Sequence, residues 1–306
     1  MPRAAWMFPG QGSQVVGMGK QLAERFPVAM RAYHDASEAL GLDLRWLCWD
    51  APQGELDRTV NAQPAILVTS IAALRAALEE GLPADDPVCL GHSLGEFTAL
   101  VAAGALELTD AVRLVRRRGE LMQAADPSGA MAAVLGLDAP AVEAAIAGTG
   151  MVVANDNAPG QVVVSGPAAA MEGSSARLRD AGAKRVVPLR VSAAFHSPAM
   201  RDAAPALREV IDATPWSALR YEVIANVDAD VHQHAGDFAD LLERQVWSPV
   251  RWTASMRRAA GEGASLFVEF GAGNVLTGLA RRILPEARTA NVSDPATLEE
   301  ALDLVR

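Results

Sequence analysis

One stretch, residues 87–97, constrains the fold more than any other. The apolar run 88–90 predicts a short buried strand, and residues 96–106 carry apolar side chains at helical spacing. Between them stands Gly-x-Ser-x-Gly, with the serine at position 93. Its glycines suit a tight turn that has no room for Cβ atoms. We therefore predict a turn that exposes Ser93 as a nucleophile at the end of a parallel strand; a serine cap in an ordinary βα loop is the alternative.

Strands alternate with helices along most of the chain. Apolar runs at 4–8, 221–225, 265–270 and 289–292 predict further strands, so we expect an α/β fold with a parallel sheet. Over residues 128–189 the predicted order is β-α-β-β-α-β, that of a ferredoxin-like unit. We therefore predict a discontinuous larger domain, 1–127 and 190–306, with a small domain, 128–189, inserted into it.

Composition argues against several classes of function. The chain has 306 residues, half of them hydrophobic, and its net charge of −10 argues against a nucleic-acid partner. It has no apolar run long enough to cross a bilayer and no signal peptide at its start, which favours a cytoplasmic protein without a membrane partner. Cys48 and Cys89 stand in apolar surroundings, so we expect buried free thiols and no metal site.

A second glycine-rich loop, residues 9–14, follows the first predicted strand. It lacks the Gly-Lys-[Ser/Thr] ending of a phosphate-binding loop and the spacing of a dinucleotide fingerprint. Its amides and the Gln11 side chain suit half of an oxyanion hole, with a plain turn as the alternative. Gln63 precedes Pro64, which we expect in the first turn of a helix; this glutamine is either a cap-region residue or a substrate contact.

A nucleophilic serine needs a base, and His196 is the favoured histidine. His92 adjoins the serine, so the turn directs its side chain away. The remaining histidines stand among charged residues, as is typical of a surface: His34, His232 and His234. No downstream aspartate stands out as a third member, and a backbone carbonyl could orient the imidazole instead. Among four arginines at 113–118, Arg118 alone lies on a different helix face from its neighbours.

Seven motifs occur in the order seen in malonyl-CoA:acyl carrier protein transacylases, a family that the chain resembles over essentially its whole length. They are FPGQGSQ at 8–14, QPA at 63–65, GHSLGE at 91–96, RG at 118–119, NxPxQxV at 157–163, FH at 195–196 and GxGxVL at 271–276. The resemblance implies an α/β-hydrolase-like core with a ferredoxin-like insert, a monomer, and malonyl-CoA as substrate without a bound cofactor.

The resemblance also implies a ping-pong transfer of a malonyl group to the phosphopantetheine thiol of an acyl carrier protein. Ser93 would attack the thioester, and His196, oriented by the main-chain carbonyl of Gln245, would act as base and then acid. The amides of Gln11 and Leu94 would hold the oxyanion. The residues expected to bind the substrate are Arg118, which would pair with the malonyl carboxylate, Gln63, Phe195 and His92.

The sequence leaves alternatives for which acyl group is transferred and which carrier protein receives it. Phe195 and Leu94 resemble the malonyl type, because the ring would fill the space of a methyl branch. The sequence at 193–196 departs from the Ser-His ending usual in fatty-acid enzymes and resembles stand-alone acyltransferases of polyketide synthases. A malonate decarboxylase carrier is a further alternative. Candidate docking residues, with ordinary surface charge as the alternative, are Lys184, Arg185, Arg281 and Arg282.

A serine esterase or thioesterase is the competing enzyme class, and a non-catalytic scaffold is a third. Arg118 argues against a hydrolase, because a buried cation facing the acyl group is costly unless the substrate brings a carboxylate. A hydrolase is also expected to show an acidic third member.

Overall fold

Two sheets organise the chain, of which the computed structural model describes residues 3–125, 128–189, 191 and 193–305. The larger sheet has six strands in the order β10-β9-β1-β2-β7-β8, and all neighbours are parallel except β7 and β8. Its strands are β1 (Arg3–Phe8), β2 (Val88–Gly91), β7 (Val223–Ile224), β8 (Val231–His232), β9 (Ala264–Phe270) and β10 (Arg288–Val292). The predicted parallel α/β sheet is therefore present.

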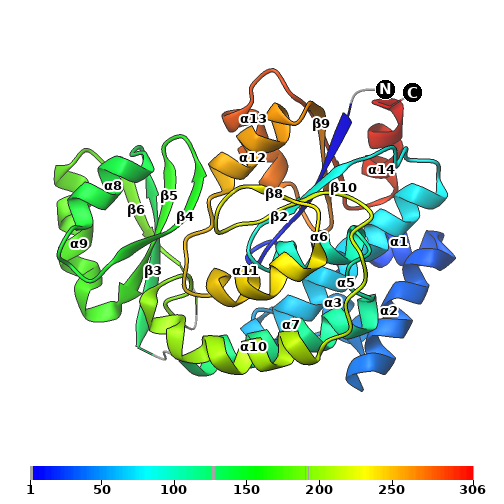
Figure 1. Cartoon of the computed structure of the whole chain (residues 1–306), viewed down its shortest axis with the longest axis horizontal. Coiled ribbons are helices and arrows are strands. Elements are labelled where there is room, and N and C mark those ends of the chain that lie inside the picture. Colours follow the sequence, from blue (N-terminus) through cyan, green and yellow to red (C-terminus); the bar gives the residue numbers. More distant parts are fainter. Residues whose placement is uncertain (1–2, 126–127, 190, 192, 306) are drawn as a thin grey trace.

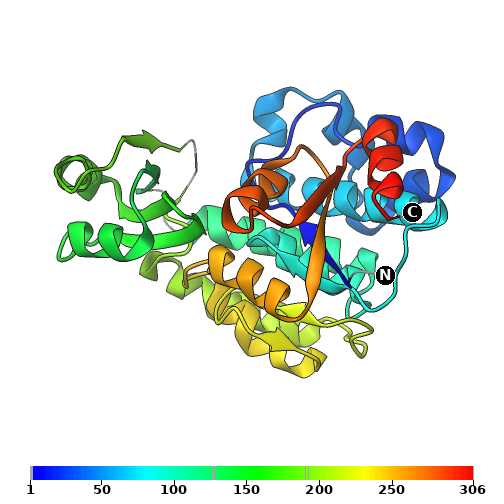
Figure 2. The same cartoon turned by 90° about the horizontal axis from the view of Figure 1, so that it is seen from above.

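Helices cover both faces of this sheet, as Figures 1 and 2 show. Alternate side chains of β1 serve the two faces: Trp6 and Phe8 belong to the larger core, and Ala5 and Met7 pack with α12 and α13. The helices around the larger core are α1 (Lys20–Arg25), α2 (Pro27–Leu40), α3 (Leu44–Trp49), α4 (Gln53–Leu56), α5 (Thr59–Glu79), α6 (Leu94–Ala102), α7 (Leu108–Ala125), α10 (Ala204–Ala213), α11 (Phe238–Gln245) and α14 (Pro295–Asp303). On the opposite face lie α12 (Trp252–Gly261) and α13 (Val275–Ile283), and short 3-10 turns are η1 (Pro198–Ala203) and η2 (Ala235–Asp237).

The expected helix start at Pro64 is wrong. Helix α5 begins at Thr59, so Pro64 lies inside it. The missing N–H of Pro64 would leave the Val60 carbonyl without its helical donor. That carbonyl instead accepts a hydrogen bond from Arg116 Nη1 on α7 at 3.1 Å. A neighbouring helix thus compensates for the proline, which local sequence could not reveal.

The smaller sheet is antiparallel, with the order β4-β5-β3-β6. Along the chain, its strands and the two helices between them follow in the order expected from the sequence: β3 (Gly129–Leu135), α8 (Ala139–Ile146), β4 (Val152–Ala158), β5 (Gln161–Pro167), α9 (Ala168–Asp180) and β6 (Arg185–Pro188). Helices α8 and α9 pack on its outer face, at one side of the molecule (Figure 1). The predicted domain limits fall on Pro127 and Arg190, which lie outside the described residues.

Strand β4 connects the two sheets. The Asp156 N–H donates to the Val250 carbonyl at 3.0 Å, and the Val250 N–H donates to the Ala154 carbonyl at 2.8 Å. Cys48 and Cys89 are buried free thiols, as predicted. Within the described part of the chain, no helix is both long enough and apolar enough to span a membrane.

Candidate active site

Ser93 occupies the turn between β2 and α6. Its backbone has φ 53° and ψ −105°, a conformation that L-residues rarely adopt. A Cβ at Gly91 would lie 1.9 Å from the carbonyl carbon of Gly95, and one at Gly95 would lie 2.0 Å from the Phe8 carbonyl oxygen. Glycine is therefore required on both sides of the serine, and the strained turn presents the hydroxyl to a cleft.

His196 lies beside the serine and is buried. Its Nε2 is 2.8 Å from Ser93 Oγ, while Nδ1 faces the main-chain carbonyls of Gln245 at 2.9 Å and Ser248 at 3.2 Å. Carbonyl oxygens only accept, so Nδ1 carries the proton and Nε2 is free to accept one from Ser93. Burial, with the Arg118 charge in second place, lowers the pKa of His196 to about 3 and keeps the imidazole neutral.

Arg118 reaches the same hydroxyl from α7. Its guanidinium donates to Ser93 Oγ at 3.1 Å, to Gln63 Oε1 at 2.9 Å and to the side-chain oxygen of Gln245 at 2.8 Å. It also lies 5.3 Å from the centre of the Phe97 ring. Burial lowers the pKa of Arg118 to about 10, so the group stays charged at neutral pH. No carboxylate among the described residues pairs with it directly.

Gln11 and Leu94 line the same cleft as Ser93. The N–H groups of Gln11 and Leu94 have no acceptor among the residues described, whereas the Gln11 side chain donates to Thr59 Oγ1 at 3.2 Å. Leu94 opens helix α6, so its amide adds to the positive end of the helix dipole.

The cleft lies between the two sheets and has a volume of about 420 Å³. The larger part contributes Ser93, Arg118, Phe195 and His196, and the smaller sheet contributes Met131, Ala133, Asn155, Asn157, Gln161 and Val163. His92 also lines it, with Nε2 2.8 Å from Asn157 Oδ1 and the ring 5.5 Å from that of Trp252. The side chain of His92 is thus held by other partners than Ser93. Among the described residues, no group of three or more histidine, cysteine or acidic side chains is arranged to hold a metal.

Two of the four expected docking residues lie near the turn between β4 and β5. Arg282 on α13 donates to Gln161 Oε1 at 2.5 Å and to the Pro159 carbonyl at 2.6 Å. Lys184 packs beside Gly136, whose N–H donates to the Gly160 carbonyl at 2.8 Å. Both cations therefore border the rim to which Gln161 belongs.

The other two docking candidates are placed differently. Arg185 is exposed at the start of β6, paired in register with Leu135. Arg281 donates to Thr289 Oγ1 at 3.0 Å and so is held toward β10. Neither Arg185 nor Arg281 is among the residues that line the cleft.

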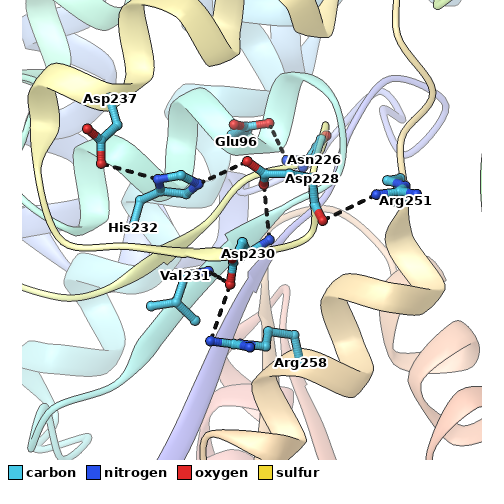
Figure 3. Close-up of polar contacts among 9 residues, drawn as sticks. All are labelled: Glu96, Asn226, Asp228, Asp230, Val231, His232, Asp237, Arg251 and Arg258. Atoms are coloured by element: carbon cyan, nitrogen blue, oxygen red, sulfur yellow. Dashed lines mark hydrogen bonds and ion pairs between the residues drawn. The ribbon is translucent and has the colours of Figure 1, made fainter.

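Two residues whose hydrogen bonds support the Ser93 turn were not predicted from the sequence. Asn226 accepts from the Ser93 N–H at 2.7 Å and donates to the Gly91 carbonyl at 2.7 Å. Buried Glu96 accepts from the Asn226 N–H at 3.1 Å (Figure 3). It also accepts from the Gln245 side chain at 2.7 Å. Asn226 stands about 130 positions from the turn and carries no local signal. Glu96 matches an ordinary acid in the first turn of a helix.

The sequence and the fold are similar to those of known proteins over nearly the whole chain. The family model of the acyl transferase domain matches residues 5–297. Over the whole chain, 45% of residues are identical to the "Malonyl CoA-acyl carrier protein transacylase" of Bacillus subtilis (strain 168), of which 98% is covered.

Two solved structures show the same likeness. An acyl carrier protein S-malonyltransferase from Vibrio cholerae is 40% identical, with a TM-score of 0.94, over 99% of this chain and 100% of that one. The structure titled "PlMCAT:AntF (holo)", a type II PKS acyl-carrier protein in complex with its malonyl-transacylase, is also 40% identical, with a TM-score of 0.94 over 99% of both chains.

Proposed function

Because the chain belongs to the malonyl-CoA:acyl carrier protein transacylases, an acyl transferase family, we propose that this acyltransferase carries a malonyl group on Ser93 between malonyl-CoA and a carrier thiol. The observation that supports this most is the environment of the Ser93 hydroxyl. A neutral imidazole lies 2.8 Å from it and a buried guanidinium 3.1 Å from it. The first suits proton transfer, and the second suits an acyl group that ends in a carboxylate.

In the first half-reaction, Ser93 Oγ attacks the thioester carbonyl and its proton passes to His196 Nε2. The amides of Gln11 and Leu94 hold the negative oxygen of the tetrahedral intermediate. The carbon–sulfur bond then breaks, and CoA leaves as a thiol with the proton from His196. A malonyl ester on Ser93 remains.

The second half-reaction reverses these roles. The thiol of a carrier-bound phosphopantetheine gives its proton to His196 and attacks the ester. The serine oxygen leaves with that proton, so the enzyme returns to its starting state. His196 needs no carboxylate partner for this cycle, because the Gln245 carbonyl fixes its orientation at 2.9 Å.

Arg118 selects the acyl group in this proposal. Among the described residues, its hydrogen-bond acceptors are three neutral oxygens, on Ser93, Gln63 and Gln245. A malonyl carboxylate offers a planar charged acceptor that an acetyl group lacks. Phe195, buried at the cleft wall, would limit branching at the next carbon.

The carrier would dock at the rim of the cleft beside Lys184 and Arg282. Carrier proteins are acidic, and these two cations border the turn that leads to Gln161 in the cleft wall. Arg185 and Arg281 remain secondary candidates. The resemblance to a polyketide carrier complex and to a transacylase of Bacillus subtilis leaves fatty-acid and polyketide carriers as alternatives, with a malonate decarboxylase carrier as a third.

We further propose the finer description of the fold. The order β4-β5-β3-β6 with both helices on one face supports a ferredoxin-like insert at 128–189, and the Ser93 turn after β2 supports an α/β-hydrolase-like core. A monomer acting in the cytoplasm is expected from the family, with no bound cofactor.

Intact-mass measurement tests the reaction. The protein is mixed separately with malonyl-, methylmalonyl- and acetyl-CoA, with Ser93→Ala as control. A malonyl adduct on the wild type alone, discharged by added holo-carrier protein, supports the proposal. Free CoA released without an adduct or carrier would indicate a hydrolase, and an adduct that persists in Ser93→Ala would refute the nucleophile.

A further inference from the structure

Glu96 is a buried carboxylate that the reaction just described does not use. It lies in the first turn of α6, three residues after Ser93, and is fully buried. Its Oε2 accepts from Gln245 Nε2 at 2.7 Å and from the Asn226 N–H at 3.1 Å. Its Oε1 has no hydrogen-bond partner among the described residues. A buried acid with one oxygen free is an unusual feature so close to a nucleophile.

The side chain of Gln245 joins this carboxylate to Arg118. Its oxygen accepts from Arg118 Nη2 at 2.8 Å, and its nitrogen donates to Glu96 Oε2 at 2.7 Å. The guanidinium and the carboxylate thus face opposite ends of one amide. The two charges also shift each other's pKa. Arg118 lowers the pKa of Glu96, and Glu96 raises the pKa of Arg118, so each favours the charged form of the other. When ionised, Glu96 is a buried anion that balances the buried cation.

A malonyl group brings a second carboxylate to the same cation. Two buried anions that share one guanidinium repel each other, and a buried acid relieves this by taking up a proton. We propose that Glu96 is the exchangeable counter-charge of Arg118: above neutral pH it is ionised in the substrate-free protein, and it takes up a proton when the substrate carboxylate binds. This inference rests on the proposed malonyl transfer and deepens it.

The geometry allows the proton without loss of a contact. Oε1 has no partner, so a proton there leaves both hydrogen bonds to Oε2 in place. The proton comes from solvent on binding and returns when the malonyl group leaves with the carrier. Burial raises the pKa of Glu96 to about 7, so the exchange is accessible near neutral pH.

One other charged group affects the ionisation of Glu96, and its contacts continue toward the protein surface. Asp228, on the segment after β7, favours the neutral form of Glu96. Its carboxylate accepts from the Asp230 N–H at 3.0 Å and faces His232 Nε2 at 3.2 Å, and the other His232 nitrogen faces Asp237 at 3.2 Å (Figure 3). Because His232 faces Asp228, a control variant replaces His232 separately from Glu96.

Single-turnover acylation, followed by rapid quench and intact mass, tests the inference. It yields the dissociation constant of the acyl-CoA and the acylation rate constant separately. The wild type is compared with Glu96→Gln at about pH 6 and about pH 8, on either side of the Glu96 pKa. We expect the wild type to bind malonyl-CoA at least about threefold more weakly at the higher pH, and Glu96→Gln to lose this dependence.

Acetyl-CoA and His232→Gln are the controls. Acetyl-CoA has the same phosphates but no acyl carboxylate, so its binding should change equally with pH in wild type and Glu96→Gln. His232→Gln should keep the wild-type pH dependence for malonyl-CoA. The inference is overturned if Glu96→Gln keeps that dependence or if His232→Gln removes it.

Calorimetry gives a second measurement that needs no turnover. With Ser93→Ala, malonyl-CoA binding in two buffers of different ionisation enthalpy reports proton uptake directly. We expect uptake with malonyl-CoA beyond that with acetyl-CoA, and its loss in the Ser93→Ala/Glu96→Gln double variant. Equal uptake in both variants would refute the role of Glu96, even if malonyl transfer by the wild type is confirmed. A wild type that forms no malonyl adduct would instead refute the proposed function.

Discussion

The imidazole of His196 donates its Nδ1 proton to the main-chain carbonyl of Gln245 at 2.9 Å, where many serine enzymes place a carboxylate. A neutral acceptor orients the ring but adds no negative charge to stabilise an imidazolium. The nearby Arg118 cation disfavours that form further. The pKa of His196, the proposed base, is therefore lowered both by burial and by the neighbouring cation.

This arrangement predicts an unusual pH profile. A base whose pKa is lowered to about 3 stays in its working form as the pH falls, and loses it only near that value. We expect the saturating acylation rate constant to change by less than about threefold from about pH 8 to about pH 5. Single-turnover mass measurements check this. A fall centred near 6.5, the ordinary value for histidine, would contradict it.

Removing Arg118 should affect malonyl and acetyl groups differently. Truncation of one partner of a buried charge pair costs about 2–5 kcal/mol, so Arg118→Ala should lower kcat/KM for malonyl-CoA by at least about 30-fold. Acetyl-CoA, which brings no carboxylate, should be affected far less. Arg117→Ala is the matched control, because this neighbour is exposed and pairs with Glu120. Equal losses for both substrates would assign Arg118 a purely structural role.

Shortening Phe195 should relax the choice of acyl group. Phe195→Ala opens space in the cleft wall, and one methyl group in such a pocket is worth about 1–3 kcal/mol. The ratio of methylmalonyl to malonyl acylation should therefore rise by about tenfold or more in a competition assay. Val275→Ala, at an exposed position of the same cleft, serves as control and should leave the ratio unchanged. An unchanged ratio in Phe195→Ala would place the selectivity elsewhere.

Asn226 should affect both stability and the nucleophile. Asn226→Ala leaves the Ser93 N–H and the Gly91 carbonyl without partners, at a cost of about 1–3 kcal/mol each in the free energy of unfolding. Because the strained turn loses its support, the acylation rate constant should fall more than substrate affinity. Urea unfolding and single-turnover kinetics measure the two effects. Asn291→Ala, which removes longer contacts on the surface, should change neither.

Glu96 should make the stability of the empty protein depend on pH. Its pKa is raised on folding from 4.5 to about 7, so its favourable contribution is complete below the unfolded value and is lost as the pH rises through the folded one. Relative to wild type, Glu96→Gln should gain on the order of 3 kcal/mol between about pH 5 and about pH 8. Urea unfolding of both proteins at the two pH values measures the difference. A constant difference would show that Glu96 does not titrate in this range.

The sequence predicted the structure correctly where neighbouring residues alone determine it. Gly91 and Gly95 could be interpreted correctly because their Cβ atoms would collide with backbone inside the turn itself. The strand and helix order of 128–189 followed from side-chain periodicity for the same reason. Pro64 was misplaced because its tolerance depends on Arg116, which reaches it from another helix.

The site itself was only partly accessible to sequence. Ser93 and Arg118 stand in recognisable sequence patterns, whereas the residues around His196 show no such pattern. In the structure, both His196 and Arg118 contact the Ser93 hydroxyl. Asn226 and the side-chain role of Gln245 arise from contacts across more than a hundred positions. Such contacts leave no local trace in one sequence.

The position of the cleft between the two sheets has a consequence for redesign. Every group proposed to make or break a bond lies on the larger part, whereas β3, β4 and β5 supply one wall of the cavity. Hydrogen bonds join the two parts, among them the contact of His92 with Asn157 and that of Asp156 with Val250. Arg118 and Phe195, which we propose select the acyl group, also lie on the larger part. Grafting the β3–β5 wall from a relative would therefore reshape one side of the cavity while leaving the reacting groups and these two residues in place.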